Sequence, residues 1–403
     1  MSTKRRYLPA LVLCITLSLA CRILSPFGTQ APESSPTIAA ASLSQSPAIP
    51  PTTELPPPTL AQVPTIVIPD GVPIEPYQDV RELNFSAYNV DLDRSLIETL
   101  WFNGTTKWPG QSGDVAQDIL ELGKNPGLGI RAIHAQGITG EGVNVAIIDQ
   151  NMVVDHPEFQ GKIVEYFDVG TDMPSTLGSM HGPAVTSLLV GENIGTAPDA
   201  NVYYVAAPSW KADAQYFADA LNWIIDENEK LPDDQKIRVV SVSAAPSGPG
   251  SPFTVNNAAW DIAYERAIEA GILVLDCTED HGIAAPCHYD LDDPENVAKC
   301  IPGWPGIETQ PMPDRIYIPT SLRTSAEEYD QGNYSYQYTG RGGLSWAIPY
   351  LSGVLALGWQ VRPDLTGEQL LEILYGSAYV TDGGLKIINP GAFIDMVRLA
   401  GSQ

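Results

Sequence analysis

The sequence predicts an α/β fold in which a doubly wound parallel sheet is flanked by helices on both faces. Three observations lead to this class. From about Gly127 onward, short apolar runs alternate with longer segments of helical periodicity. The run 143–149 (VNVAIID) is almost wholly apolar, as expected for a parallel strand buried on both faces. The segments between the runs are long enough to be crossover helices between parallel strands.

The same alternation can be followed along the chain, element by element. After the strand at 143–149, it predicts further strands at 201–207, 237–245 and 272–279, and helices at 181–191, at 213–230, at 259–271, from about Ser345 and at 366–378. No internal repeat interrupts this order. We therefore assign residues 127–403 to one large domain.

Residues 1–21 have the organisation of an export signal. Basic residues at 4–6 precede an apolar stretch at 7–20, which is too short to span a bilayer comfortably. Ala20 directly before Cys21 resembles a bacterial lipobox, which implies that Cys21 is lipidated and holds the protein on the outer side of a cell membrane. Plain secretion after cleavage near Ala20 and an uncleaved anchor are the alternatives.

Two segments separate this signal from the large domain. Residues 22–74 form a tether: from Ile23 to Pro69 the chain has eleven prolines, two acidic residues and no basic ones. Such a composition cannot bury enough apolar area to offset the entropy of ordering. Residues 75–126 are mixed in character. They are either a strap on the large domain or a residual pro-segment.

The composition limits the partners. Lys and Arg total 22 against 48 Asp and Glu, for a formal net charge of −26. Binding to nucleic acid requires a basic face, so this class of partner is excluded. With 44% hydrophobic and 17% charged residues, the chain can bury a full core. We expect a monomer.

The cysteines are consistent with export. If Cys14 leaves with the signal and Cys21 carries lipid, three remain, so at most one intrachain disulfide can form. Cys287 and Cys300 close a short loop in polar, turn-rich sequence and are predicted to pair. Cys277 ends an apolar strand and is predicted to be a buried thiol.

Three polar residues stand at the ends of predicted elements. Asp149 ends the strand 143–149, and ligands of parallel α/β sheets bind at the carboxyl ends of strands. His181 and Ser345 each begin a helix. A carboxylate, an imidazole and a hydroxyl together activate a serine nucleophile, because the imidazole removes the hydroxyl proton and the carboxylate fixes the imidazole tautomer. Taken singly, each residue also suits a cap, turn or loop.

The sequence around these residues resembles the subtilase family of serine peptidases, whose triad has the chain order Asp, His, Ser. The resemblance extends from about Gly127 to Leu399. The blocks that carry it are GITGEGVNVAIIDQNMVVDHPEF (137–159), HGPAVTSLLVG (181–191), GTAPDANVYYV (195–205) and GGLSWAIPYLSGVLAL (342–357). The last block has the family's proline four residues after the serine.

The resemblance implies a subtilisin-like fold and an endopeptidase that hydrolyses polypeptides through an acyl-enzyme. In that reaction Asp149 orients the base, His181 is the base and then the acid, and Ser345 is the nucleophile. SVSAAPSG (241–248) resembles the family's substrate-binding strand. It implies that the cleft is lined by Ser243, Ala244 and Ala245.

One block departs from the family. In VLDCTEDHG (274–282) the oxyanion asparagine is replaced by Asp280, as in a rare branch that carries aspartate in this catalytic role. We expect a partly buried site, which keeps more of the carboxyl protonated and able to donate. Such departures favour an alternative function, a weak or inactive subtilase that acts as a binding or scaffolding protein. An esterase on another α/β fold is disfavoured, because no G-x-S-x-G elbow surrounds Ser345.

The expected chemistry requires no cofactor. The acidic loop YDLDDPEN (289–296) offers oxygen ligands and is a candidate structural Ca²⁺ site, with a plain acidic loop as the alternative.

Overall fold

The computed structural model describes residues 65–400, which lie within one compact unit spanning residues 59–403. The predictions for the signal segment 1–21, for lipidation of Cys21 and for residues 22–64 of the tether lie outside the described residues. No helix in the described part is both long and apolar enough to cross a membrane.

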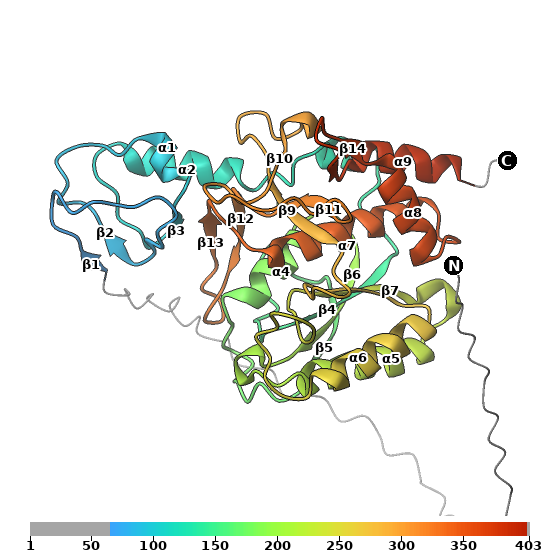
Figure 1. Cartoon of the computed structure of the whole chain (residues 1–403). Coiled ribbons are helices and arrows are strands. Elements are labelled where there is room, and N and C mark those ends of the chain that lie inside the picture. The colour runs from blue at the N-terminus through green and yellow to red at the C-terminus, as the bar shows by residue number, and fades with distance from the viewer. Residues whose placement is uncertain (1–64, 401–403) are drawn as a thin grey trace, which may run out of the picture. The chain divides into compact units, whose positions relative to one another are not determined.

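The centre of the domain is a five-stranded parallel sheet with the order β5-β6-β4-β7-β8 (Figure 1). The strands are β4 (Asn144–Asp149), β5 (Ile163–Asp168), β6 (Asn201–Ala206), β7 (Ile237–Val242) and β8 (Leu273–Leu275). β4 pairs with β6 on one side and with β7 on the other. The chain first winds toward β6 and later toward β7, so the winding direction reverses beside β4. Crevices for ligands open at such a switch point, beyond the carboxyl ends of the strands.

Helices cover both faces of this sheet, as the sequence predicts. α5 (Gln215–Lys230) and α6 (Asn257–Glu269) pack on one face, in a cluster with Ala146 and Ile148 of β4. α4 (His181–Val190) and α7 (Leu344–Val361) pack on the other, in a cluster with Val145 and Ile147. Figure 1 shows the sheet between these two layers. Because alternate side chains of a strand point to opposite faces, two covered faces require an apolar residue at nearly every position.

A second, mixed sheet packs near α7. Its order is β10-β9-β11-β15-β14, with bounds β9 (Ala284–His288), β10 (Ile301–Pro302), β11 (Ile316–Pro319), β14 (Tyr379–Val380) and β15 (Lys386–Ile387). The predicted disulfide between Cys287 and Cys300 is confirmed and fastens β9 to the start of β10. Cys277 is a free, half-buried thiol. α8 (Gly367–Ser377) and α9 (Pro390–Leu399) follow α7.

Residues 75–126 pack on this domain through a third sheet. In it β3 (Trp101–Asn103) pairs antiparallel with β13 (Ser335–Thr339), which pairs with β12 (Arg323–Glu327). In Figure 1 the cyan strap with α1 (Arg94–Ile97) and α2 (Ser112–Leu122) adjoins β12 and β13. The remaining elements are β1 (Ile66–Val67), β2 (Leu83–Asn84) and α3 (Ile130–His134). Residues 75–126 thus supply the third strand, β3, of the sheet β12-β13-β3. After β13 the chain continues into α7, where Ser345 lies.

The structure differs from the sequence prediction at two strands of the central sheet. β5 was not predicted, because its residues are half-buried or exposed at the sheet edge and include two acidic side chains. The strand expected at 272–279 ends at Leu275. There the Asp276 carboxylate accepts hydrogen bonds from the Thr278 backbone N–H and hydroxyl, which turns the chain out of the sheet.

Candidate active site

Asp149 and His181 form a hydrogen-bonded pair at the carboxyl end of β4. The carboxylate is almost fully buried, and its Oδ1 lies 2.7 Å from His181 Nδ1. The same oxygen accepts the backbone N–H of Gln150 at 2.8 Å. Since the carboxylate accepts a hydrogen bond from Nδ1–H, it fixes the tautomer of His181 in which Nε2 has a free lone pair.

The start of α4 carries His181 close to this strand end. The residue after it, Gly182, packs so tightly that an added Cβ would lie 2.6 Å from the Gln150 carbonyl oxygen and from the Tyr204 hydroxyl. A larger residue would push α4 away from β4. Glycine is therefore required here for the Asp149–His181 distance.

Ser345 lies in the first turn of α7, where Gly342 and Gly343 precede it. Gly342 has φ +66°, and an added Cβ would overlap the Thr320 carbonyl oxygen. Two glycines thus let the chain turn sharply into α7. The Trp346 N–H donates to the Gly343 carbonyl at 2.9 Å. The N–H groups of Leu344 and Ser345, by contrast, precede the first intrahelical bonds and can face a developing anion.

Pro349 has a direct effect on the hydrogen bonds of Ser345. Lacking an N–H, it cannot donate to the Ser345 carbonyl one turn earlier. The free carbonyl instead accepts the Ser243 hydroxyl at 2.8 Å, and the Ser345 hydroxyl donates to the Ser243 carbonyl at 3.2 Å. This reciprocal pair joins the end of β7 to the start of α7.

The structure brings the predicted triad into one region, with one contact missing. The Trp346 ring lies 5.4 Å from the His181 ring, between centroids, so α7 begins beside the imidazole. Among the hydrogen bonds of residues 65–400, the Ser345 hydroxyl bonds to the Ser243 carbonyl rather than to His181. A rotation about the Ser345 side chain would be needed before the imidazole could accept its proton.

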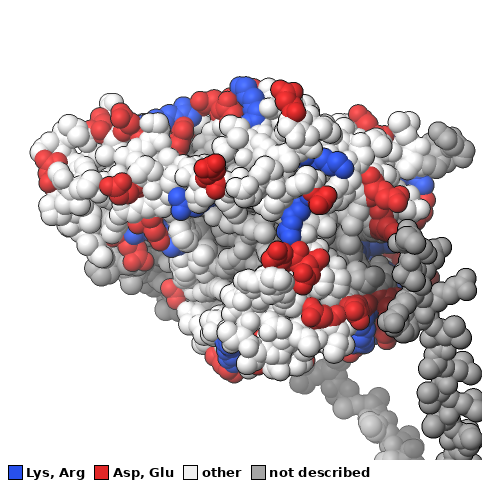
Figure 2. All heavy atoms as spheres, in the orientation of Figure 1, with Lys and Arg blue, Asp and Glu red and all other residues white. Residues whose placement is uncertain are grey.

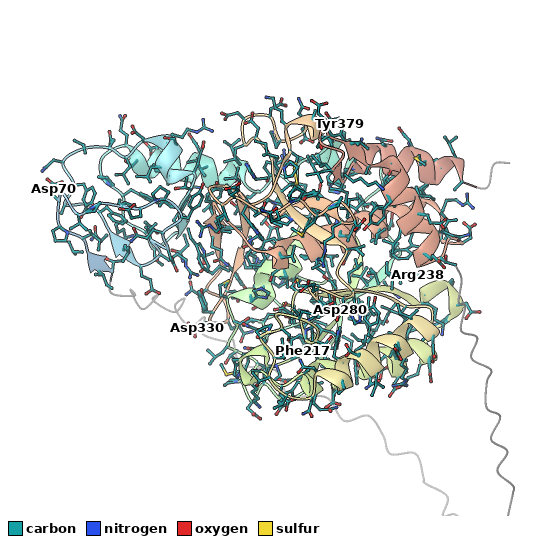
Figure 3. The ribbon with its side chains drawn as sticks, in the orientation of Figure 1. Asp70, Phe217, Arg238, Asp280, Asp330 and Tyr379 are labelled. Atoms are coloured by element: carbon teal, nitrogen blue, oxygen red, sulfur yellow. A yellow bond between two sulfur atoms is a disulfide. The ribbon has the colours of Figure 1, made fainter. Side chains whose placement is uncertain are left out.

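A cavity of about 330 Å³ opens beside this pair. Its lining includes Asp149, His181 and the three residues predicted to line the cleft, Ser243, Ala244 and Ala245. The rest of the wall is largely aromatic and apolar, formed by Trp210, Phe217, Pro252 and Phe253. Figure 3 labels Phe217, which projects from α5. The cavity is therefore suited to an apolar group.

Asp280, the residue expected at the oxyanion position, lies in the exposed turn that follows β8. The residue is exposed rather than partly buried, and its carboxylate lies against Gly248. A carboxylate donates a hydrogen bond only when it carries a proton and otherwise only accepts hydrogen bonds. Figure 3 shows Asp280 near the carboxyl ends of the central strands.

Electrostatics at the pair favour a charged imidazole. Burial lowers the pKa of His181, but the charge and hydrogen bond of Asp149 outweigh it, so the pKa lies above the ordinary value of 6.5. Burial also raises the pKa of the Cys277 thiol. Cys277 is thus an unreactive thiol at neutral pH.

The acidic side chains of the loop 289–296 form ion pairs with basic side chains of the protein. Lys299 pairs with Asp290 at 3.1 Å and with Asp293 at 2.8 Å, and Arg94 pairs with Asp292 at 2.6 Å. Within residues 65–400 no group of three or more His, Cys, Asp or Glu side chains is arranged to hold a metal ion. The Ca²⁺ site suggested for this loop gains no support from these contacts.

The site also contains residues that the sequence analysis did not name. Gln150 donates to the Ser209 hydroxyl at 2.8 Å and so links the end of β4 to the cavity wall. Trp210 is half exposed at the cavity, and Trp346 packs beside His181. Trp346 directly follows Ser345 and could have been found from the serine block.

These features define a subtilisin-like α/β domain with an Asp–His pair and a serine at a helix start. Residues 140–301 match the sequence model of the subtilase family, so this part of the chain is similar to the subtilisin-like serine peptidases.

Curated relatives are distant. The chain is 22% identical over 279 residues to the subtilisin-like protease PopC of Myxococcus xanthus, covering 62% of this chain and 58% of PopC. It is 27% identical over 287 residues to the serine protease AprX of Bacillus subtilis, covering 60% and 62%. Thus the matched region spans less than two thirds of either relative.

Among solved structures, fervidolysin from Fervidobacterium pennivorans, described as a keratinolytic enzyme related to subtilisin, is similar with a TM-score of 0.49 and 17% identity. The match covers 66% of this chain and 45% of fervidolysin.

Proposed function

We propose that the protein is an exported serine endopeptidase, lipid-anchored through Cys21, that cleaves polypeptides by an acyl-enzyme route. The observation that carries the proposal is the 2.7 Å hydrogen bond between Asp149 and His181 Nδ1, beside the helix start that presents Ser345. This arrangement leaves Nε2 free on the side of the nucleophile.

Each step can be assigned to a group of the chain. His181 Nε2 takes the proton of Ser345 as Oγ attacks the scissile carbonyl, whose π electrons move onto oxygen. Backbone N–H groups at the start of α7 donate to that oxyanion. When the tetrahedral species collapses, the C–N bond breaks and the amine leaves with the proton from His181. Water, deprotonated by the same imidazole, then attacks the acyl-enzyme and regenerates Ser345.

The substrate is a polypeptide bound in extended form along Ser243–Ala245. β7 ends at Val242, so these three residues lie just beyond the sheet. An apolar substrate side chain would enter the neighbouring cavity between Phe217 and Phe253. The family and the aromatic wall both support this substrate class.

The test is hydrolysis of a peptide substrate by purified protein and by Ser345→Ala. We expect hydrolysis to be lost in the variant while the thermal transition stays nearly unchanged, because the half-buried hydroxyl makes one long hydrogen bond of 3.2 Å. Near-parental hydrolysis by the variant would exclude Ser345 as the nucleophile.

A second candidate function is a binding or scaffolding subtilase without turnover. Two observations favour it: the Ser345 hydroxyl bonds to the Ser243 carbonyl, and Asp280 is exposed in place of the oxyanion donor. A folded parental protein that binds peptides without cleaving them would identify this function.

The anchor is tested separately. Cys21→Ser should move the protein from the membrane fraction to the soluble fraction in a bacterial host that processes lipoproteins. Unchanged fractionation would favour an uncleaved anchor.

A further inference from the structure

Glu328 is a buried carboxylate that lacks a partner on one side. It follows β12 directly, and its side chain is 0% exposed. Oε1 accepts the Gly332 backbone N–H at 3.0 Å, whereas Oε2 is buried with no hydrogen-bond partner. A buried charged oxygen without a partner is costly, so a group that binds it would stabilise the fold.

A second carboxylate faces Glu328 from another segment. Asp155 belongs to the stretch after β4, and its Oδ1 is also buried without a partner. Its Oδ2 is 3.4 Å from the Tyr334 hydroxyl and from the Gln331 side-chain amide. Burial and, to a smaller extent, the charge of Asp155 raise the pKa of Glu328 to about 7, against the opposing effect of the hydrogen bond from the Gly332 N–H.

No basic side chain compensates this pair. In the described part of the chain neither carboxylate takes part in an ion pair. Arg81 lies 3.8 Å from the neighbouring Glu327 instead, and His156 Nε2 donates to the Ser335 carbonyl. Within the described residues two carboxyl groups therefore face each other without a basic side chain to compensate them.

The pair lies where three segments of the active site meet. Asp155 follows the strand that ends in Asp149. The hairpin tip after Glu328 pairs with the loop that leads to His181, since the Tyr329 carbonyl accepts the Gly178 N–H at 2.8 Å and Gln331 N–H donates to the Thr176 carbonyl at 3.0 Å. Figure 3 labels Asp330 at this tip. The hairpin then continues through β13 toward Ser345.

We propose that Asp155 and Glu328 bind a divalent cation, Ca²⁺, which fastens the hairpin β12–β13 to the segments that carry Asp149 and His181. Ca²⁺ suits the site because it accepts irregular sets of oxygen ligands, including carboxylates, amide and backbone carbonyls and water. Gln331 can supply an amide oxygen, because the two ends of its side-chain amide are interchangeable in position. The proposal does not depend on peptidase activity.

The test uses the full chain carrying Ser345→Ala, freed of metal with EDTA, at pH 8. Added Ca²⁺ should raise the thermal transition of this protein by several degrees. The same ion should leave the transition of a Glu328→Gln variant almost unchanged. Asp330→Asn removes one charge from an exposed residue of the same turn and serves as the matched control, which should respond like the parent.

Tb³⁺ luminescence gives a second measurement. Tb³⁺ replaces Ca²⁺ in oxygen sites, and Tyr334 next to Asp155 should sensitise its emission. We expect Glu328→Gln to weaken Tb³⁺ binding by more than about tenfold. The loss of a residue that only orients a metal ligand already lowers metal affinity by about that factor. If Glu328→Gln does not fold, Asp155→Asn provides the same comparison.

Two outcomes would overturn the proposal. One is a transition temperature that does not change when Ca²⁺ is added at pH 8 but rises on acidification toward pH 6. This result would mean that the two carboxyl groups share a proton and bind no ion. The other is a Ca²⁺ response that persists in Glu328→Gln and Asp155→Asn, which would place the ion elsewhere.

Discussion

Phe102 provides the most informative test of the strap at residues 75–126. Its ring is 2% exposed, stands edge-on to Trp108 at a centroid distance of 5.3 Å and lies 5.0 Å from Tyr338. Phe102 and Tyr338 are also cross-strand partners of β3 and β13. Phe102→Ala removes this packing and leaves a cavity, for which about 3–5 kcal/mol of stability is typically lost.

The assay is urea unfolding in the Ser345→Ala background, where self-cleavage cannot interfere. Val90→Ala is the control, because Val90 lies in the same strap but is 68% exposed and should change stability by less than about 0.5 kcal/mol. If Phe102→Ala costs no more than this control, the strap is not part of the cooperative unit. A removable pro-segment would then be the better description of residues 75–126.

Three further predictions concern the disulfide, the base and the oxyanion site. Cys300→Ser opens a loop with a sequence separation of 13 and should cost about 3 kcal/mol in urea unfolding; an unchanged midpoint would mean that the bond is not formed. Activity requires neutral His181, whose pKa is raised by Asp149, so hydrolysis should fall as pH drops through a midpoint above 6.5. Asp149→Asn should move this midpoint down and reduce kcat by about 10⁴-fold; an unmoved midpoint would contradict the pairing. Asp280→Asn supplies a donor at every pH and should raise the rate at neutral and alkaline pH, by up to about 10²–10³-fold. A variant slower at all pH values would show that Asp280 is not at the oxyanion position.

The sequence was sufficient for four of the five central strands, β4, β6, β7 and β8, and for the elements that carry Asp149, His181 and Ser345. Asp149 could be placed because a run of apolar residues on both faces identifies a central parallel strand, and the end of such a strand is a known place for ligands. The Cys287–Cys300 pairing followed from loop length and polarity alone. Both features depend on residues that are close together in the chain, so the pattern of a single sequence is enough to predict them.

Features that depend on contacts between distant segments were not predictable. β12 is fully buried yet has the sequence RTSAE, so no apolar pattern identifies it. The hydrogen bonds between Ser243 and Ser345 arise only because Pro349 frees a carbonyl beside the end of β7. The exposure of Asp280 and the facing of Asp155 and Glu328 are set by loops, whose paths sequence patterns do not fix.

The surface agrees with the composition. Figure 2 shows acidic side chains spread over the visible face, with basic ones as separate spots among them. This distribution fits the net charge of −26 and the expectation that nucleic acid is not a partner.

The most direct test of the proposed mechanism is labelling with a fluorophosphonate, which reacts only with an activated serine. The folded protein should be labelled at Ser345, as located by peptide mass spectrometry, and His181→Ala should lose the label because no base remains to activate the hydroxyl. Absence of label from folded parental protein, or equal labelling of His181→Ala, would contradict the account of Ser345 as a nucleophile activated by the Asp149–His181 pair.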